Sequence, residues 1–181
     1  MTIKGHQKNR KGLLQRGLTD EVVAQWQDQM PSVDPITLSL GAIVTRISIL
    51  NDKILARLCK EYGISTGALK LILALRRIGP PYVRRPTDLY QLLAVTSGAV
   101  TYTINLLGKE GLVEMIDDPQ DGRSRLVQLT PRGLQLVNDV TVRNVELLQR
   151  AWADLEPRDK RDTVQRLLEL ARCWERIADR L

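Results

Sequence analysis

The segment DPQDGRSRLVQLTPRG at residues 118–133 holds the side chains best suited to binding chemistry. Its Asp-Pro and Asp-Gly pairs predict a turn at residues 118–124, and the alternating apolar residues after them favour a strand. The segment therefore predicts a β-hairpin whose tip carries Arg123 and Arg125. Guanidinium groups at such a tip can bind phosphates or enter a DNA groove. The alternative is an ordinary hairpin with local surface ion pairs, each worth less than about 1 kcal/mol.

Acidic residues lie beside the two arginines, namely Asp117, Asp118 and Asp121. A surface made only to grip DNA would not carry three acids. We therefore expect at least one acid to hold an arginine in position by a charge-assisted hydrogen bond. Asp118 and Asp121 are the candidate residues for structuring the hairpin. The sequence leaves open whether Arg123 or Arg125 is the arginine that is held.

A pair of helices is predicted before the hairpin, at residues 88–94 and 96–110. In the second helix, Val100, Ile104 and Leu107 share one face and predict its anchor to the domain. The opposite face carries hydrogen-bonding side chains with the reach for base edges and phosphates. The alternative is the solvated face of an ordinary amphipathic helix. The candidate DNA-binding residues of this second helix are Thr96, Ser97, Gly98, Thr101, Tyr102 and Asn105.

Further cations precede the helix pair. Arg84 and Arg85 lie in a predicted extended segment, because Pro86 disfavours a helical conformation at the residue before it. Thr87 is expected to cap the first helix of the pair. We include Arg84, Arg85 and Thr87 among the candidate DNA-binding residues. A helix pair followed by a hairpin is the layout of a winged helix-turn-helix.

The composition of the 181 residues favours helices built around an aliphatic core. Aromatic residues make up 4% of the chain, and no Phe is present. The net charge is +6, and residues 1–16 carry five basic residues and no acidic one. The other 22 basic and 21 acidic residues nearly cancel. We expect a solvated, disordered basic tail; the alternative is an arm that contacts DNA phosphates.

The composition argues against metal binding, catalysis, membrane insertion and secretion. His6 is the one histidine, so the sequence offers no His cluster for metal binding or acid–base catalysis, and we expect neither cofactor nor enzymatic activity. No apolar run approaches the roughly 18 residues of a membrane span, and no secretory signal is evident. Cys59 and Cys173 lie far apart, which fits a reducing cytoplasm. We expect both to be buried, inert thiols; the alternative is an oxidation sensor.

The fold class predicted from these patterns is mostly α with a small β-hairpin wing. Wide apolar faces on the helices that flank the winged domain exceed what one small domain can cover, so we expect a homodimer. The predicted order along the chain is a basic disordered tail at 1–18, N-terminal dimerisation helices at 19–62, a winged helix-turn-helix at 63–129 and C-terminal dimerisation helices at 130–181.

The chain resembles the MarR family of bacterial transcription regulators over residues 35–181. Three leucines at 89, 92 and 93, the segment AVTYTINLLGKEGLV at 99–113 and the Asp-Pro-x-Asp-x-Arg wing pattern carry the resemblance. It implies a homodimeric, ligand-responsive repressor that binds double-stranded DNA at a pseudo-palindromic operator. It also implies a cleft for a small-molecule effector between the dimerisation and DNA-binding regions. The alternative function is a winged-helix module that binds another protein and no DNA.

The chain departs from the family pattern at several positions. Many relatives carry basic residues where Tyr102, Leu106 and Gly122 stand here, so the reading helix has no cation before Lys109. A predicted helix at residues 19–30 precedes the family's usual first helix and contains Trp26. Some relatives that sense urate or similar anions have such an extension. We expect Trp26 to be a packing anchor rather than part of an effector site.

Overall fold

A computed structural model describes residues 20–93 and 95–178, with the backbone alone at position 123. The chain divides into two compact units, Met1–Thr66 and Gly67–Leu181, and each is considered by itself. The basic tail expected at 1–18 and a cap at Thr19 lie outside the described residues. The mostly helical fold with a small antiparallel sheet confirms the predicted fold class.

The first unit contains two helices. One spans residues 20–29, and the second is α2, Pro35–Glu61. Asp34 caps α2, because its carboxylate accepts hydrogen bonds from the Thr37 N–H at 2.7 Å and the Thr37 hydroxyl at 2.6 Å. Gly63, with φ of +67°, follows the end of α2, where a left-handed conformation suits glycine. Both helices were predicted close to these positions.

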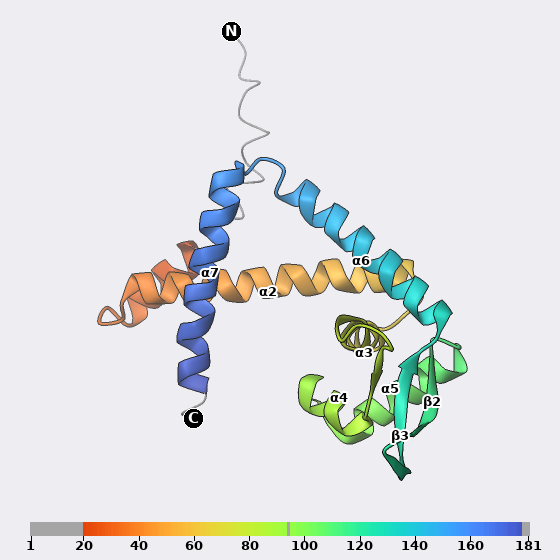
Figure 1. Cartoon of the computed structure of the whole chain (residues 1–181). Coiled ribbons are helices and arrows are strands. Elements are labelled where there is room, and N and C mark those ends of the chain that lie inside the picture. Colours follow the sequence, from red (N-terminus) through yellow and green to blue (C-terminus); the bar gives the residue numbers. More distant parts are fainter. Residues whose placement is uncertain (1–19, 94, 179–181) are drawn as a thin grey trace. The chain divides into compact units, whose positions relative to one another are not determined.

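The second unit holds the winged domain and the C-terminal helices (Figure 1). Its three-stranded antiparallel sheet has the order β1-β3-β2. The hairpin was predicted, and the short extended segment before the helix pair becomes its third strand. The elements are α3 (Thr66–Arg77), β1 (Val83–Arg84), α4 (Pro86–Leu93), α5 (Ser97–Lys109), β2 (Val113–Asp118), β3 (Asp121–Leu129), α6 (Pro131–Ala151) and α7 (Pro157–Ala178).

Aliphatic side chains form the core of the second unit, as expected for a chain without Phe. One face of α3 is almost fully buried, and α4, α5, α6 and the sheet contribute the rest. Burial of each such side chain contributes roughly 1.5–3 kcal/mol to folding. The largest fully buried side chains of this unit are Leu71, Ile72, Leu75, Leu89, Leu107, Val127, Val137 and Val140.

The junction between the hairpin and α6 is tightly built. The Thr130 hydroxyl donates a hydrogen bond to the Gly111 carbonyl at 2.7 Å and accepts one from the Gly133 N–H at 3.0 Å. Thr130 therefore caps α6 and also binds the segment that ends α5. Gly133 is buried against the backbone of Leu112, which leaves no room for a side chain. The start of α6 is thereby fixed to the root of the hairpin.

Two local predictions were wrong. Thr87 does not cap α4, because the helix begins at Pro86. Proline suits the first helical position, since the N–H it lacks has no partner there. The predicted turn at 118–124 was too long: β3 begins at Asp121, so the strands are joined through Pro119 and Gln120 alone.

The C-terminal helix α7 has no buried residue. Cys173 on this helix is exposed, so the expectation of a buried thiol is wrong there, because no described part of the chain covers α7. Cys59 on α2 is buried as predicted, and burial raises the pKa of its thiol. Among the described helices, none combines the length and apolarity that crossing a membrane requires.

Candidate nucleic-acid interface

The helix pair of the winged domain consists of α4 and α5. Leu89 of α4 is fully buried, and Val100, Ile104 and Leu107 turn into the core from α5. This confirms the anchoring face predicted for the second helix. The opposite face of α5 is therefore held rigidly toward the surface.

The start of α5 is set by Thr96. Its hydroxyl accepts a hydrogen bond from the Ala99 N–H at 3.3 Å, which is the geometry of a helix cap. Ser97 and Gly98 form the first turn, and both are exposed. A Cβ placed on Gly98 would meet no atom within 4 Å, so the first turn is open to a ligand. Backbone N–H groups at such an exposed helix start can bind phosphate.

The exposed face of α5 carries the predicted hydrogen-bonding side chains. Thr101, Tyr102 and Asn105 are exposed, and 72% of the Tyr102 side chain is accessible. None of these three has a hydrogen-bond partner within the described part of the chain. Thr103, by contrast, donates its hydroxyl hydrogen to the Ala99 carbonyl at 2.8 Å. The uncommitted groups of α5 thus lie together on its outer face.

The turn of the wing is organised around Asp118. Its Oδ1 accepts a hydrogen bond from the Gln120 N–H at 2.9 Å. Its Oδ2 accepts two from Arg85, from Nη2 at 2.6 Å and from Nε at 3.0 Å. Two hydrogen bonds hold the pKa of the Asp118 carboxyl below its ordinary value. The larger effect comes from the Gln120 N–H and the smaller from Arg85. The same contact raises the pKa of Arg85.

Asp121 opens the second strand of the wing. Its carboxylate accepts a hydrogen bond from the Ser124 hydroxyl at 2.6 Å. Asp118 and Asp121 are opposite each other in the strand register, after an irregularity between Asp117 and Asp118. Both candidate wing-structuring residues thus lie at the turn itself.

The arginines of the wing lie on β3 rather than in its turn. Arg125 donates a hydrogen bond to the Met115 carbonyl at 2.8 Å, and its Nε lies 3.7 Å from Asp117 Oδ1. The side chain of Arg123 lies outside the described part of the structure. The expectation that an acid holds an arginine of the hairpin missed the strongest pair, because that pair uses Arg85 from outside the hairpin.

Arg84 lies beside this pair. It is exposed on β1, opposite Val127 of β3, and has no ion-pair partner within the described residues. Arg84 therefore comes from the outer strand β1 and Arg125 from the middle strand β3. Thr87 is exposed on α4, and its hydroxyl lies 3.3 Å from Asp88 Oδ1. The structure thus brings candidates from β1, α4, α5 and the hairpin into one unit.

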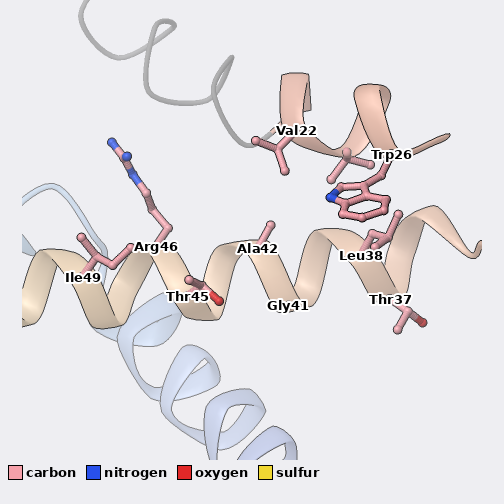
Figure 2. Close-up of a pocket in the computed structure, with 10 residues that line it drawn as sticks. Val22, Trp26, Thr37, Leu38, Gly41, Ala42, Thr45, Arg46 and Ile49 are labelled. Carbon is pink, nitrogen blue, oxygen red and sulfur yellow. The ribbon is translucent and has the colours of Figure 1, made fainter. Parts of the chain in front are cut away.

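A hollow lies in the first unit, between the helix at 20–29 and α2. It has a volume of about 470 Å³. Figure 2 shows the indole of Trp26 lying over α2 near Leu38, with Arg46 farther along α2. Half of the Trp26 side chain is exposed. The small residues Gly41 and Ala42 of α2 also line the hollow.

Comparisons with known proteins agree with this geometry. A model of the winged helix DNA-binding domain matches residues 72–133. The transcriptional regulator PecS of Dickeya dadantii is 28% identical over 126 residues, which cover 70% of this chain and 76% of PecS.

Solved structures show the same fold. A cysteine-to-serine mutant of MarR from E. coli superposes with a TM-score of 0.61 at 25% identity, covering 73% of this chain and 95% of that one. The same mutant in complex with operator DNA gives a TM-score of 0.60 at 22% identity, with coverages of 81% and 96%. Residues 72–133 thus match a winged helix DNA-binding domain, and the chain is similar in sequence and fold to transcriptional regulators of the MarR family.

Proposed function

We propose that this regulator binds double-stranded DNA sequence-specifically, with α5 in the major groove and the hairpin beside it. The observation that carries the proposal is the outer face of α5, whose polar groups have no partner in the described chain. The solved complex of MarR with operator DNA supports the same use of this fold. Recognition helices of helix-turn-helix proteins contact bases through their N-terminal residues.

Arginines supply the electrostatic part of the proposed contact. The helix α5 itself offers Lys109, in its last turn, as its single basic residue. Arg84 on β1 and Arg125 on β3 are exposed, and Arg123 precedes Arg125 by two residues on β3. Phosphate contacts fix the position of a protein on DNA, whereas base contacts give specificity. We therefore assign affinity mainly to these arginines and specificity mainly to α5.

The same proposal includes a homodimer that binds a pseudo-palindromic operator. Large apolar side chains are exposed on α2, α6 and α7, in patches that a soluble monomer rarely leaves uncovered. On α7 these side chains recur at helical spacing along one face. A second copy of the chain is the occupant that two-fold DNA recognition requires. The exposed apolar residues of α7 are Val164, Leu167, Leu168, Trp174 and Ile177.

A small-molecule effector that weakens repression completes the proposal. In place of the packing role expected for Trp26, we assign the candidate site to the hollow beside it, because this hollow combines apolar walls with the guanidinium of Arg46 and the hydroxyl of Thr45. Such a lining suits a small, mainly apolar molecule with one anionic group. A ligand bound there should raise the melting temperature of the protein and lower its affinity for DNA. Both effects should be lost in Trp26→Ala.

The direct test is a fluorescence anisotropy titration of the full chain against the promoter DNA that flanks its own gene. We expect a specific complex at low salt that a shuffled duplex of equal length does not form. Light scattering on the same sample reports the oligomeric state. A folded dimer that forms no specific complex with genomic DNA in a selection would contradict the proposed function. A folded monomer that still binds specifically would contradict the dimer alone. We propose that regulation involves no catalysis, as in the transcriptional regulators that the chain resembles.

A further inference from the structure

The middle of the exposed face of α5 is a row of residues at helical spacing. Gly98, Thr101 and Asn105 follow one another three and four residues apart, so they lie on one line along the helix. Tyr102 flanks this line on one side. Because Val100, Ile104 and Leu107 fix the opposite face in the core, this row is the part of α5 that points outward.

The side chains of this row are free to bind. Asn105 is exposed and makes no hydrogen bond within the described part of the chain, so its amide retains both a donor and an acceptor. Thr101 likewise keeps its hydroxyl and its methyl group uncommitted. Gly98 adds no bulk at the start of the row. A base pair can therefore approach the helix closely at its N-terminal end.

Side chains that recognise guanine are missing from the row. The commonest guanine contact uses Arg or Lys to donate two hydrogen bonds to O6 and N7. In α5 the sole basic residue is Lys109, in the last turn and one turn beyond Asn105. Arg84 and Arg125 lie on strands, where they suit phosphates. An amide, by contrast, pairs with adenine through N6 and N7.

We propose that α5 reads adenine–thymine pairs in the major groove, with Asn105 bound to N6 and N7 of one adenine. The methyl group of Thr101 and the ring of Tyr102 contact thymine methyl groups next to it. This inference rests on the proposed DNA binding and specifies the base pairs recognised. The operator half-site is A·T-rich beneath α5, and guanines contribute little to affinity there.

The test begins with a selection of duplexes from a random pool by the full-length protein. Each adenine of the selected half-site is then replaced by 7-deazaadenine, and each guanine by 7-deazaguanine, which removes the N7 acceptor. We expect one adenine in each half-site at which the replacement weakens binding by about tenfold, the effect of losing part of a bidentate contact. Guanine replacements beneath α5 should change binding by less than about twofold.

Asn105→Ala assigns the contact. In this variant, replacing that adenine with 7-deazaadenine should no longer weaken binding. The dependence of affinity on salt should stay as in the parent protein. Lys109→Ala is the matched control on the same helix. It should leave the effect of each deaza replacement on binding unchanged. A phosphate contact by Lys109 would lower the slope of log affinity against log salt by about one unit. Circular dichroism confirms that both variants are folded.

The outcomes separate this inference from the proposed function. Selection of a specific sequence whose sensitive bases are guanines would overturn the inference and leave sequence-specific DNA binding standing. A sensitive adenine that stays sensitive in Asn105→Ala would also overturn it. No specific sequence from the selection, with folded protein, would instead contradict DNA recognition itself.

Discussion

Arg85 and Asp118 are joined by two hydrogen bonds, from Nη2 at 2.6 Å and Nε at 3.0 Å to the same carboxylate oxygen. The Asp118 side chain is only 5% exposed, whereas 43% of the Arg85 side chain is accessible. Arg85 lies between β1 and α4, and Asp118 closes the turn of the hairpin. The pair therefore binds the tip of the wing to the start of the helix pair. It fixes the arginines of the hairpin relative to α4 and so to α5.

Asp118→Asn should weaken DNA binding by about tenfold, the effect expected when a charge-assisted hydrogen bond is lost. An asparagine keeps an oxygen for the Gln120 N–H, but it brings no charge to Arg85. The dependence of affinity on salt should stay as in the parent protein, because Asp118 itself does not touch phosphate. Anisotropy titrations at several salt concentrations measure both quantities.

Arg85→Ala provides the second half of this test. If Arg85 also touches a phosphate, its removal lowers the salt slope by about one unit, which Asp118→Asn does not. The double variant should bind about as weakly as Arg85→Ala alone, since the two side chains act as a pair. Additive losses in the double variant would show that the ion pair does not position the wing.

The Asp118 carboxylate should also make stability depend on pH. Its pKa in the folded protein is lowered, so its contribution to stability is fully present above its unfolded pKa of about 4. That contribution is lost as the pH falls through the lower folded pKa. The difference in melting temperature between the parent and Asp118→Asn should be constant above about pH 5 and shrink below pH 4. Asp117→Asn, at an exposed neighbour, is the control and should give a much smaller difference at every pH.

Arg125→Ala should lower the slope of log affinity against log salt by about one unit, if Arg125 contacts a phosphate. The same prediction applies to Arg123→Ala. Arg150→Ala is the matched control, because this exposed arginine lies in the last turn of α6, whereas the hairpin leads into the first. Unchanged slopes in both Arg123→Ala and Arg125→Ala would mean that the wing does not touch DNA.

Local sequence signals predicted much of this fold and of the α5 face. The caps at Asp34, Thr96 and Thr130 were predictable because each bonds to an N–H three residues along the chain. The exposed face of α5 followed from helical periodicity. The Arg85–Asp118 pair was not predictable in this way. Its members lie 33 residues apart, and their contact depends on β1 pairing with β3.

The turn of the hairpin was predicted too long for a similar reason. Four of the five residues from Asp118 to Gly122 are turn formers, so composition alone allows several turns. Cross-strand pairing of Asp118 with Asp121, with the Gln120 N–H bound to the Asp118 carboxylate, selects the shortest one. Arg123 and Arg125 consequently lie within a strand.

Thr130→Ala should destabilise the protein by about 1–2 kcal/mol, because it removes a helix cap and a hydrogen bond to the preceding segment. The hydroxyl binds the Gly133 N–H at 3.0 Å and the Gly111 carbonyl at 2.7 Å. Urea denaturation followed by circular dichroism measures the change. Thr130→Ser keeps the hydroxyl and should cost less than half as much. Equal losses in the two variants would mean that the methyl group, not the hydroxyl, is what stabilises the junction.

Gly133→Ala should destabilise the protein although alanine is the better helix former. The added Cβ would overlap the Leu112 carbonyl oxygen and lie 2.9 Å from the carbonyl carbon, so backbone has to move. Such overpacking costs roughly 1–3 kcal/mol, against a gain of up to about 1 kcal/mol in helix propensity. Gly98→Ala is the matched control, since it is also helical but has open space at its Cβ. It should keep or raise stability in urea denaturation, and it should weaken DNA binding if a base or phosphate approaches α5 there. If Gly133→Ala were as stable as Gly98→Ala, the close contact between α6 and the root of the hairpin would not exist in solution.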